Sequence, residues 1–185
     1  MSDPGTRLLV VGYGNPGRGD DGLGPAFAEA VEKLDLPGVT VDVNYQLTVE
    51  ITDAVARHPV VVFADAELRG PEPFWFRPVK PRVTPGWSFT SHHLDPTAVL
   101  ALAEEIFGAR PVGYLLGIRG YAFEELKEAL TANAAANLAA AVQFFQAAWQ
   151  EGSLQPSAAG AAPLAAEVWL RRNHERIQDC NPVRG

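Results

Sequence analysis

Three short stretches of the chain carry side chains that can bind a divalent metal ion or move protons. Asp20 and Asp21 follow a glycine-rich segment, Asp65 ends an apolar run, and His92 and His93 precede a segment typical of a helix start. Two carboxylates and one imidazole suit a borderline divalent ion and leave coordination positions open for water or substrate. Each stretch alone also has a structural explanation, since such residues commonly cap helices or face solvent. Their combination predicts a site, provided that the fold brings them together.

The first stretch lies between a predicted strand and a predicted helix. Residues 8–11 (LLVV) form a continuous apolar run, which is typical of a strand buried on both faces of a parallel sheet. The cluster 12–17 (GYGNPG) predicts a loop, and apolar residues at helical spacing predict a helix over 25–34. The loop therefore follows the carboxyl end of the strand, where ligands bind in open α/β sheets.

The rest of the chain alternates strands and helices. We predict strands at 39–43, 60–64 and 111–117, an edge strand at 74–79, and helices at 49–57, 96–107 and 123–150. This order predicts an α/β domain of three layers, with a twisted, mostly parallel sheet of about five strands and helices on both faces. We assign this domain to residues 1–151. Residues 152–185 are expected to form a linker and a loosely attached extension, with one helix possible at 164–176.

Composition limits the classes of partner. The chain of 185 residues has a formal net charge of −7, which argues against nucleic acid or an anionic membrane surface as a partner. Cys180 is its only cysteine, and neither a signal peptide nor a run of about 18 apolar residues is present, so we expect a cytoplasmic protein. We also expect a monomer. Five prolines and four aromatic residues at 70–87 predict either an edge that covers the sheet or a contact with a partner protein.

A dinucleotide site is one alternative at the glycine loop. Gly12, Gly14 and Gly17 satisfy the spacing G-x-G-x-x-G, and Asp42 lies near the end of the second predicted strand, where an acid that binds ribose would stand. In that motif the helix begins at the glycines, and its positive end binds the pyrophosphate. Here Pro16 intervenes and two carboxylates follow, so the pattern disfavours an anionic ligand.

The three stretches together resemble the motifs of the nickel-iron hydrogenase maturation endopeptidases. They are 12–24 (GYGNPGRGDDGLG), 60–66 (VVVFADA) and 90–94 (TSHHL), and the general similarity extends over 8–149. The resemblance implies a phosphorylase/hydrolase-like α/β fold. It also implies an endopeptidase that removes a short C-terminal peptide from the precursor of the hydrogenase large subunit once nickel has been inserted.

The resemblance also implies roles for single residues. Asp21, Asp65 and His92 would bind the metal and act in catalysis, and His92 is preferred over His93 because Leu94 follows it at the motif's spacing. The metal would be nickel carried by the substrate, and zinc or cadmium could occupy the site in vitro. Around these residues, Gly12, Gly14, Asn15, Asp20 and His93 are candidates for shaping the loop and binding substrate.

The chain departs from the family pattern after the second predicted strand. Family members often carry Asp-Gly-Gly-Thr there, whereas this chain has the sequence VNYQ at 43–46. A second resemblance is to the peptidyl-tRNA hydrolases, which also open with G-x-G-N-P-G but need a catalytic histidine soon after it; here no histidine occurs before His58. A third hypothesis is a binding module without catalysis. Such a module would need no divalent ion and would lose only stability when Asp21 is replaced by Asn.

Overall fold

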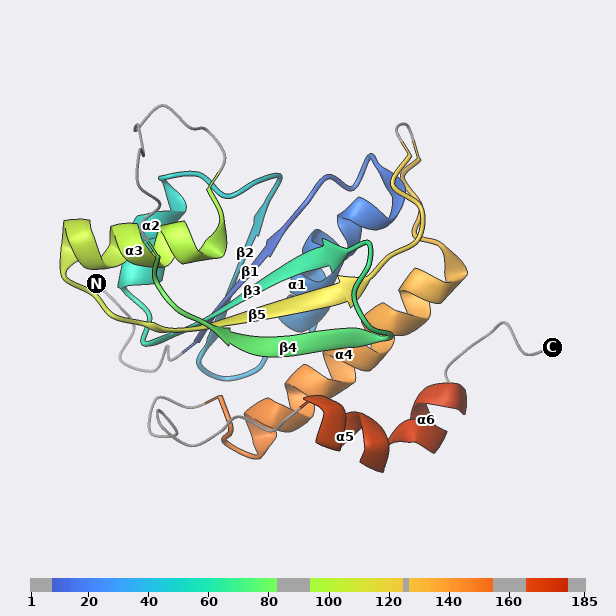
Figure 1. Cartoon of the computed structure of the whole chain (residues 1–185). Helices are drawn as coiled ribbons and strands as arrows, with labels where there is room; N and C mark the ends of the chain where they lie inside the picture. The colour runs from blue at the N-terminus through green and yellow to red at the C-terminus, as the bar shows by residue number, and fades with distance from the viewer. Residues whose placement is uncertain (1–7, 83–93, 125–126, 155–165, 180–185) are drawn as a thin grey trace.

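A computed structural model describes residues 8–82, 94–124, 127–154 and 166–179. Its centre is one sheet in the order β2-β1-β3-β5-β4, drawn in Figure 1 with helices before and behind it. The strands are β1 (Leu8–Tyr13), β2 (Val39–Asn44), β3 (Val60–Glu67), β4 (Phe74–Val79) and β5 (Val112–Arg119). All neighbouring strands pair in parallel except β4 and β5, which are antiparallel. The predicted α/β sheet is confirmed.

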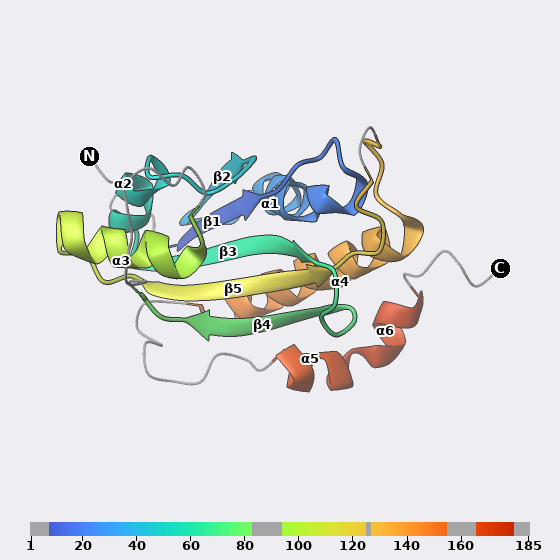
Figure 2. The same ribbon diagram turned by 45° about the horizontal axis from the view of Figure 1, so that its top comes forward.

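Helices cover both faces of the sheet, as predicted (Figure 2). On one face α1 (Leu23–Lys33) and α4 (Ala132–Gln150) pack against residues such as Val10 and Val62, which alternate along the strands. On the other face α2 (Ile51–Ala56) and α3 (Pro96–Phe107) pack against the intervening residues, including Val11 and Phe63. A short 3-10 helix, η1 (Gly19–Gly22), precedes α1. The long apolar strands form because both of their faces are buried.

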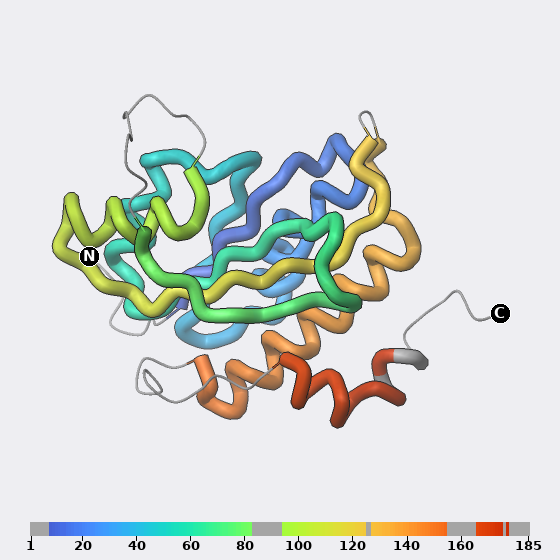
Figure 3. The backbone as a smooth tube through the Cα atoms, viewed as in Figure 1, coloured from blue at the N-terminus to red at the C-terminus, as the bar shows by residue number. Residues whose placement is uncertain are grey.

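The predicted start of the long helix at residue 123 is wrong. Helix α4 begins at Ala132 because Thr131 is its N-cap, and the Thr131 hydroxyl accepts a hydrogen bond from the Ala134 N–H at 3.3 Å. The described residues before the cap pair with the glycine loop instead: Lys127 N–H donates to the Gly17 carbonyl at 3.1 Å. Figure 3 shows the two segments side by side.

The C-terminal segment differs from the expectation in two ways. It contains two short helices, α5 (Ala166–Arg172) and α6 (His174–Asp179), where one was expected. Trp169 of α5 is only 6% exposed, and its ring centroid lies 5.7 Å from that of Phe144 in α4 and 6.4 Å from that of Phe74 in β4. The expected loose attachment is therefore wrong for the described part of this segment.

The aromatic, proline-rich segment begins as an edge strand. Phe74 is buried, and the Phe76 ring stacks on that of Tyr114 at 5.0 Å between centroids, so both side chains belong to the core. The predicted edge strand at 74–79 is confirmed, while Trp87 lies outside the described residues. None of the helices in the described part of the chain combines the length and apolar character needed to cross a membrane.

Candidate metal and active site

The order of the strands defines where a ligand can bind. From β1 the chain crosses to β2 on one side and then returns to β3 on the other, so the strand order reverses at β1. In open α/β sheets ligands bind beyond the carboxyl ends of the strands at such a reversal. Asp21 follows β1 and Asp65 lies near the carboxyl end of β3, so both predicted ligands stand at this point.

Gly14 allows the loop after β1 to pack closely against η1. Gly14 has a φ of 140°, and a Cβ atom there would overlap the carbonyl oxygen of Asp21. Within the turn, the Asn15 side-chain Oδ1 accepts from the Gly17 N–H at 2.9 Å. The backbone N–H of Asn15 donates to Asp21 Oδ2 at 3.0 Å. The loop thus orients the Asp21 carboxylate, which is partly buried, through one of its oxygens.

The Asp65 carboxylate is held by two donors. The Ala66 N–H donates to Asp65 Oδ1 at 2.8 Å, and the Tyr13 hydroxyl donates a second hydrogen bond. Burial raises the pKa of Asp65 to about 6, the hydrogen bonds oppose this rise, and the negative charges of Asp21 and Glu67 add to it. The two carboxylates are therefore close enough to repel one another, which a cation between them would relieve.

Tyr13 is a site residue that the sequence motifs did not single out. Gly12 pairs with Ala64 in the register of β1 and β3, so Tyr13 and Asp65, one residue further on, are neighbours. Burial and the nearby Asp65 charge raise the pKa of Tyr13 well above its usual range, which keeps the phenol protonated as a donor. Tyr13 could have been found by aligning the ends of the two predicted strands.

Asp20 has a different environment from Asp21. Its side chain is fully buried and accepts four hydrogen bonds: from the N–H groups of Tyr121, Ala122 and Thr131 at 2.8, 3.0 and 2.7 Å, and from the Thr131 hydroxyl at 2.9 Å. Burial raises the pKa of Asp20, but these bonds outweigh it and hold the pKa below its usual range. Asp20 therefore attaches the loop to the segment between β5 and α4, and this placement favours a structural role over the predicted contact with substrate.

His92 and His93 lie outside the described residues. The chain is described again from Leu94, whose N–H donates to the Leu47 carbonyl at 3.0 Å. Within the described ranges, no group of three His, Cys, Asp or Glu side chains is placed to hold a metal ion. The structure therefore brings together the two predicted carboxylate ligands, and the histidine ligand stays a prediction.

The likeness of this chain to known proteins lies in its structure. No protein-family model matches the sequence, and no curated protein sequence matches it either. Among solved structures, the hydrogenase maturating endopeptidase HybD from E. coli has a TM-score of 0.62 and 22% identity, over 80% of this chain and 94% of that chain. The chain has the fold of the hydrogenase maturation endopeptidases.

Two archaeal structures extend this likeness. The [NiFe] hydrogenase maturation protease HycI from Thermococcus kodakarensis KOD1 has a TM-score of 0.58 and 24% identity, over 77% of this chain and 92% of that chain. A hydrogenase 2 maturation peptidase from Thaumarchaeota archaeon SCGC_AB-539-E09 has a TM-score of 0.56 and 22% identity, over 78% and 98% of the respective chains. The maturation-endopeptidase fold therefore extends over most of this chain.

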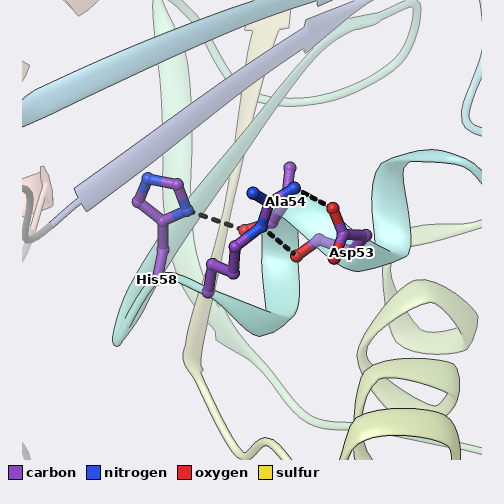
Figure 4. Close-up of polar contacts among 4 residues, drawn as sticks. Asp53, Ala54 and His58 are labelled. Carbon is purple, nitrogen blue, oxygen red and sulfur yellow. Dashed lines mark hydrogen bonds and ion pairs between the residues drawn. The ribbon is translucent and has the colours of Figure 1, made fainter. Parts of the chain in front are cut away.

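His58, the first histidine of the chain, lies at the opposite end of the sheet from the candidate site. His58 follows α2 and precedes β3, at the amino end of the strand whose carboxyl end carries Asp65. Its ring Nδ1 lies 2.7 Å from the carbonyl oxygen of Ala54, so this nitrogen carries a proton and donates it to the carbonyl. Figure 4 marks this contact with a dashed line. His58 cannot serve as a base beside the glycine loop, which disfavours the peptidyl-tRNA hydrolase alternative.

The dinucleotide alternative is also disfavoured by the position of α1. The helix begins at Leu23, after η1, and both acids of the motif lie in η1. Its N-terminus is therefore preceded by two carboxylates, where the motif would need room for a pyrophosphate. Asp42, the candidate for binding ribose, accepts a hydrogen bond at 3.0 Å from the side-chain amide of Asn44.

Proposed function

We propose that this protein is an endopeptidase that removes a C-terminal peptide from the nickel-loaded large-subunit precursor of a nickel-iron hydrogenase. The observation that supports it most is the meeting of two oriented carboxylates, Asp21 and Asp65, at the strand-order reversal of a maturation-endopeptidase fold. Two neighbouring carboxylates of like charge suit a divalent cation, which in this proposal arrives with the substrate.

In this proposal Asp21, Asp65 and His92 are the residues that recognise nickel in the precursor. The donor set of oxygen and nitrogen atoms suits a borderline divalent ion such as nickel or zinc. Asn15 and Ala66 each hold one carboxylate oxygen through a backbone N–H, and Tyr13 adds a donor to Asp65. These contacts orient the ligands before substrate arrives, which reduces the cost of binding.

The ion would supply Lewis-acid chemistry, by polarising the scissile carbonyl or by lowering the pKa of an attacking water. The raised pKa of Asp65, about 6, suits a group that gains or loses a proton near neutral pH. Ligation by these residues would also explain selectivity, because a precursor without nickel would present nothing for the carboxylates to bind. Cleavage would then follow nickel insertion.

The test follows the C-terminus of the precursor by mass spectrometry after incubation with the protein. Nickel-loaded and nickel-free precursor are compared, with Asp21→Asn as the site variant and Asp53→Asn as its control. Asp53 is exposed and forms an ion pair with Arg57, the residue after α2, so the Asp53→Asn variant removes the same charge at a residue outside the proposed site.

The expected result is loss of a short peptide from the loaded precursor only, abolished in Asp21→Asn and retained in Asp53→Asn. Cleavage of the nickel-free precursor at the same rate would contradict metal recognition. Equal activity of Asp21→Asn and the unaltered protein would show that Asp21 has only a structural role and would contradict its assignment as a metal ligand.

A further inference from the structure

The two edge strands of the sheet, β2 and β4, differ in the residues they contain. The outer edge at β4 contains Arg77 and Pro78, residues that discourage pairing with another strand, and Trp169 of α5 packs against Phe74 of the same strand. The opposite edge is β2, whose sequence VTVDVN contains neither proline nor lysine. Among the described residues, β1 is the only strand that pairs with β2.

The hydrogen bonds define which residues of β2 face outward. The Gly38 carbonyl accepts from the Leu8 N–H at 3.1 Å, and the Asn44 carbonyl accepts from the Gly14 N–H at 3.1 Å. In a parallel pair, alternate residues direct both their N–H and C=O groups toward the partner strand. Even-numbered residues of β2 therefore face β1, while Val41 and Val43 direct their backbone groups away from the sheet.

Exposed apolar side chains continue this edge at the end nearest the site. Val43 is 43% exposed, Tyr45 is 71% exposed, and Val49 in the following loop is 49% exposed. Parallel strands lie about 4.8 Å apart, so a segment added beside β2 would run roughly 10 Å from β1, whose loop carries Asp21. A chain leaving this edge beyond Tyr45 can therefore turn across the carboxyl ends toward both acids.

We propose that the outer edge of β2, with Val43 and Tyr45, binds an extended apolar segment of the substrate protein next to its cleaved bond. The inference rests on the proposed function and names where that substrate docks. Backbone hydrogen bonds to residues 41 and 43 would hold the segment as an added strand, and Tyr45 would contact one of its apolar side chains. A protease gains from this mode, since it binds the substrate extended and leaves the scissile bond accessible.

The test measures binding and cleavage separately. A fluorescein-labelled peptide with the C-terminal sequence of the cognate precursor is titrated with the protein, and fluorescence anisotropy gives its Kd. Val43→Pro removes one outward N–H but leaves the bonds of the even-numbered residues to β1, and Tyr45→Ser removes the exposed ring. Ile106→Ser is the matched control, because Ile106 is 52% exposed at the end of α3. Thermal melts verify that each variant is folded.

We expect Val43→Pro to raise the Kd at least fivefold and Tyr45→Ser about tenfold, with Ile106→Ser unchanged. Asp21→Asn should bind the peptide normally and fail to cleave the loaded precursor, which separates docking from chemistry. Unchanged Kd values for both edge variants, in folded protein, would overturn the docking proposal while leaving the proposed function intact. Dissociation of a dimer by Val43→Pro would assign the edge to a second copy of this chain and would also overturn it. A cognate precursor that is neither bound nor cleaved would overturn both.

Discussion

Replacing Asp20 by Ala tests how the loop that carries Asp21 is held in place. Asp20 is fully buried, and its carboxylate accepts bonds from three backbone N–H groups and one hydroxyl in the segment between β5 and α4. Alanine would leave these donors without their acceptor. Loss of this acceptor weakens the contact between the loop and the segment, so the substitution loosens the wall of the site.

The expected loss follows from these contacts. Hydrogen bonds to a charged group contribute about 1.5–3 kcal/mol each in favourable cases, but they are not additive and the loop can relax. A working value is about 3–5 kcal/mol, because each buried donor left without an acceptor costs about 1–3 kcal/mol and relaxation of the loop recovers part of the sum. That is a large fraction of the roughly 5–15 kcal/mol that stabilises a typical domain.

Urea unfolding followed by circular dichroism measures this loss. Asp95→Ala is the calibrating control: Asp95 is the N-cap of α3 and accepts from the Ala98 N–H at 2.9 Å, so about 1 kcal/mol is expected. A loss below about 1 kcal/mol for Asp20→Ala would refute the argument that Asp20 is a buried anchor.

The pH dependence of unfolding gives a second check on Asp20. Because its pKa is lowered in the folded state, its contribution is present above the unfolded value of 3.8 and is lost as pH falls through the folded pKa. Acid unfolding of the Asp20→Ala variant should therefore depend less on pH below about 4 than that of the unaltered protein. An identical acid profile for the two proteins would contradict this assignment.

Three further predictions concern the site and the C-terminal segment. Tyr13→Phe removes a hydrogen-bond donor to Asp65 and should weaken zinc binding, measured by calorimetry, by about 10- to 100-fold. Tyr114→Phe is the control. Equal zinc affinities of Tyr13→Phe and the unaltered protein would exclude a positioning role for Tyr13. Trp169→Ala should lower the free energy of unfolding by about 3–5 kcal/mol, since the ring is buried against Phe74 and Phe144, and a change within error would mean that α5 is not docked. The pKa of Asp65 is raised from 3.8 to about 6 in the folded protein, so the folded state binds this proton more tightly than the unfolded state. The free energy of unfolding of the metal-free protein should therefore increase as the pH falls from about 6 to 4. The Asp65→Asn variant should show no such increase, and an increase retained in the variant would disprove the assignment.

Local patterns in the sequence determine the strands and most of the helices of this protein. The apolar runs at 8–11 and 60–64 become β1 and β3 because a strand buried on both faces needs no polar alternation. Pro96 after Asp95 predicts the start of α3 for a similar local reason, since Asp caps the helix and proline suits its first turn. Such features depend on neighbours in the chain and can be derived without a tertiary structure.

The tertiary structure decides where separate segments meet. Asp20 and Asp21 are adjacent and chemically identical, yet one is buried with four donors and the other is partly exposed beside Asp65. Nothing in the local pattern distinguishes them, because the donors to Asp20 come from residues more than a hundred positions later. The described residues between β5 and α4 contact Asp20 and the glycine loop instead of forming a helix, so α4 begins after its Thr131 cap and not at residue 123.

The identity of the candidate ligands was therefore determined by the sequence, and their environment only by the fold. Types and spacing indicated Asp65 and the pair of Asp20 and Asp21, because parallel strands end at the same edge of a sheet, and the family resemblance selected Asp21 from the pair. The contact of Tyr13 with Asp65, the raised pKa of that carboxyl and the open edge of β2 depend on strand order and register. Those are set by long-range packing, in which the free energy of burying both faces of the sheet outweighs any single local preference.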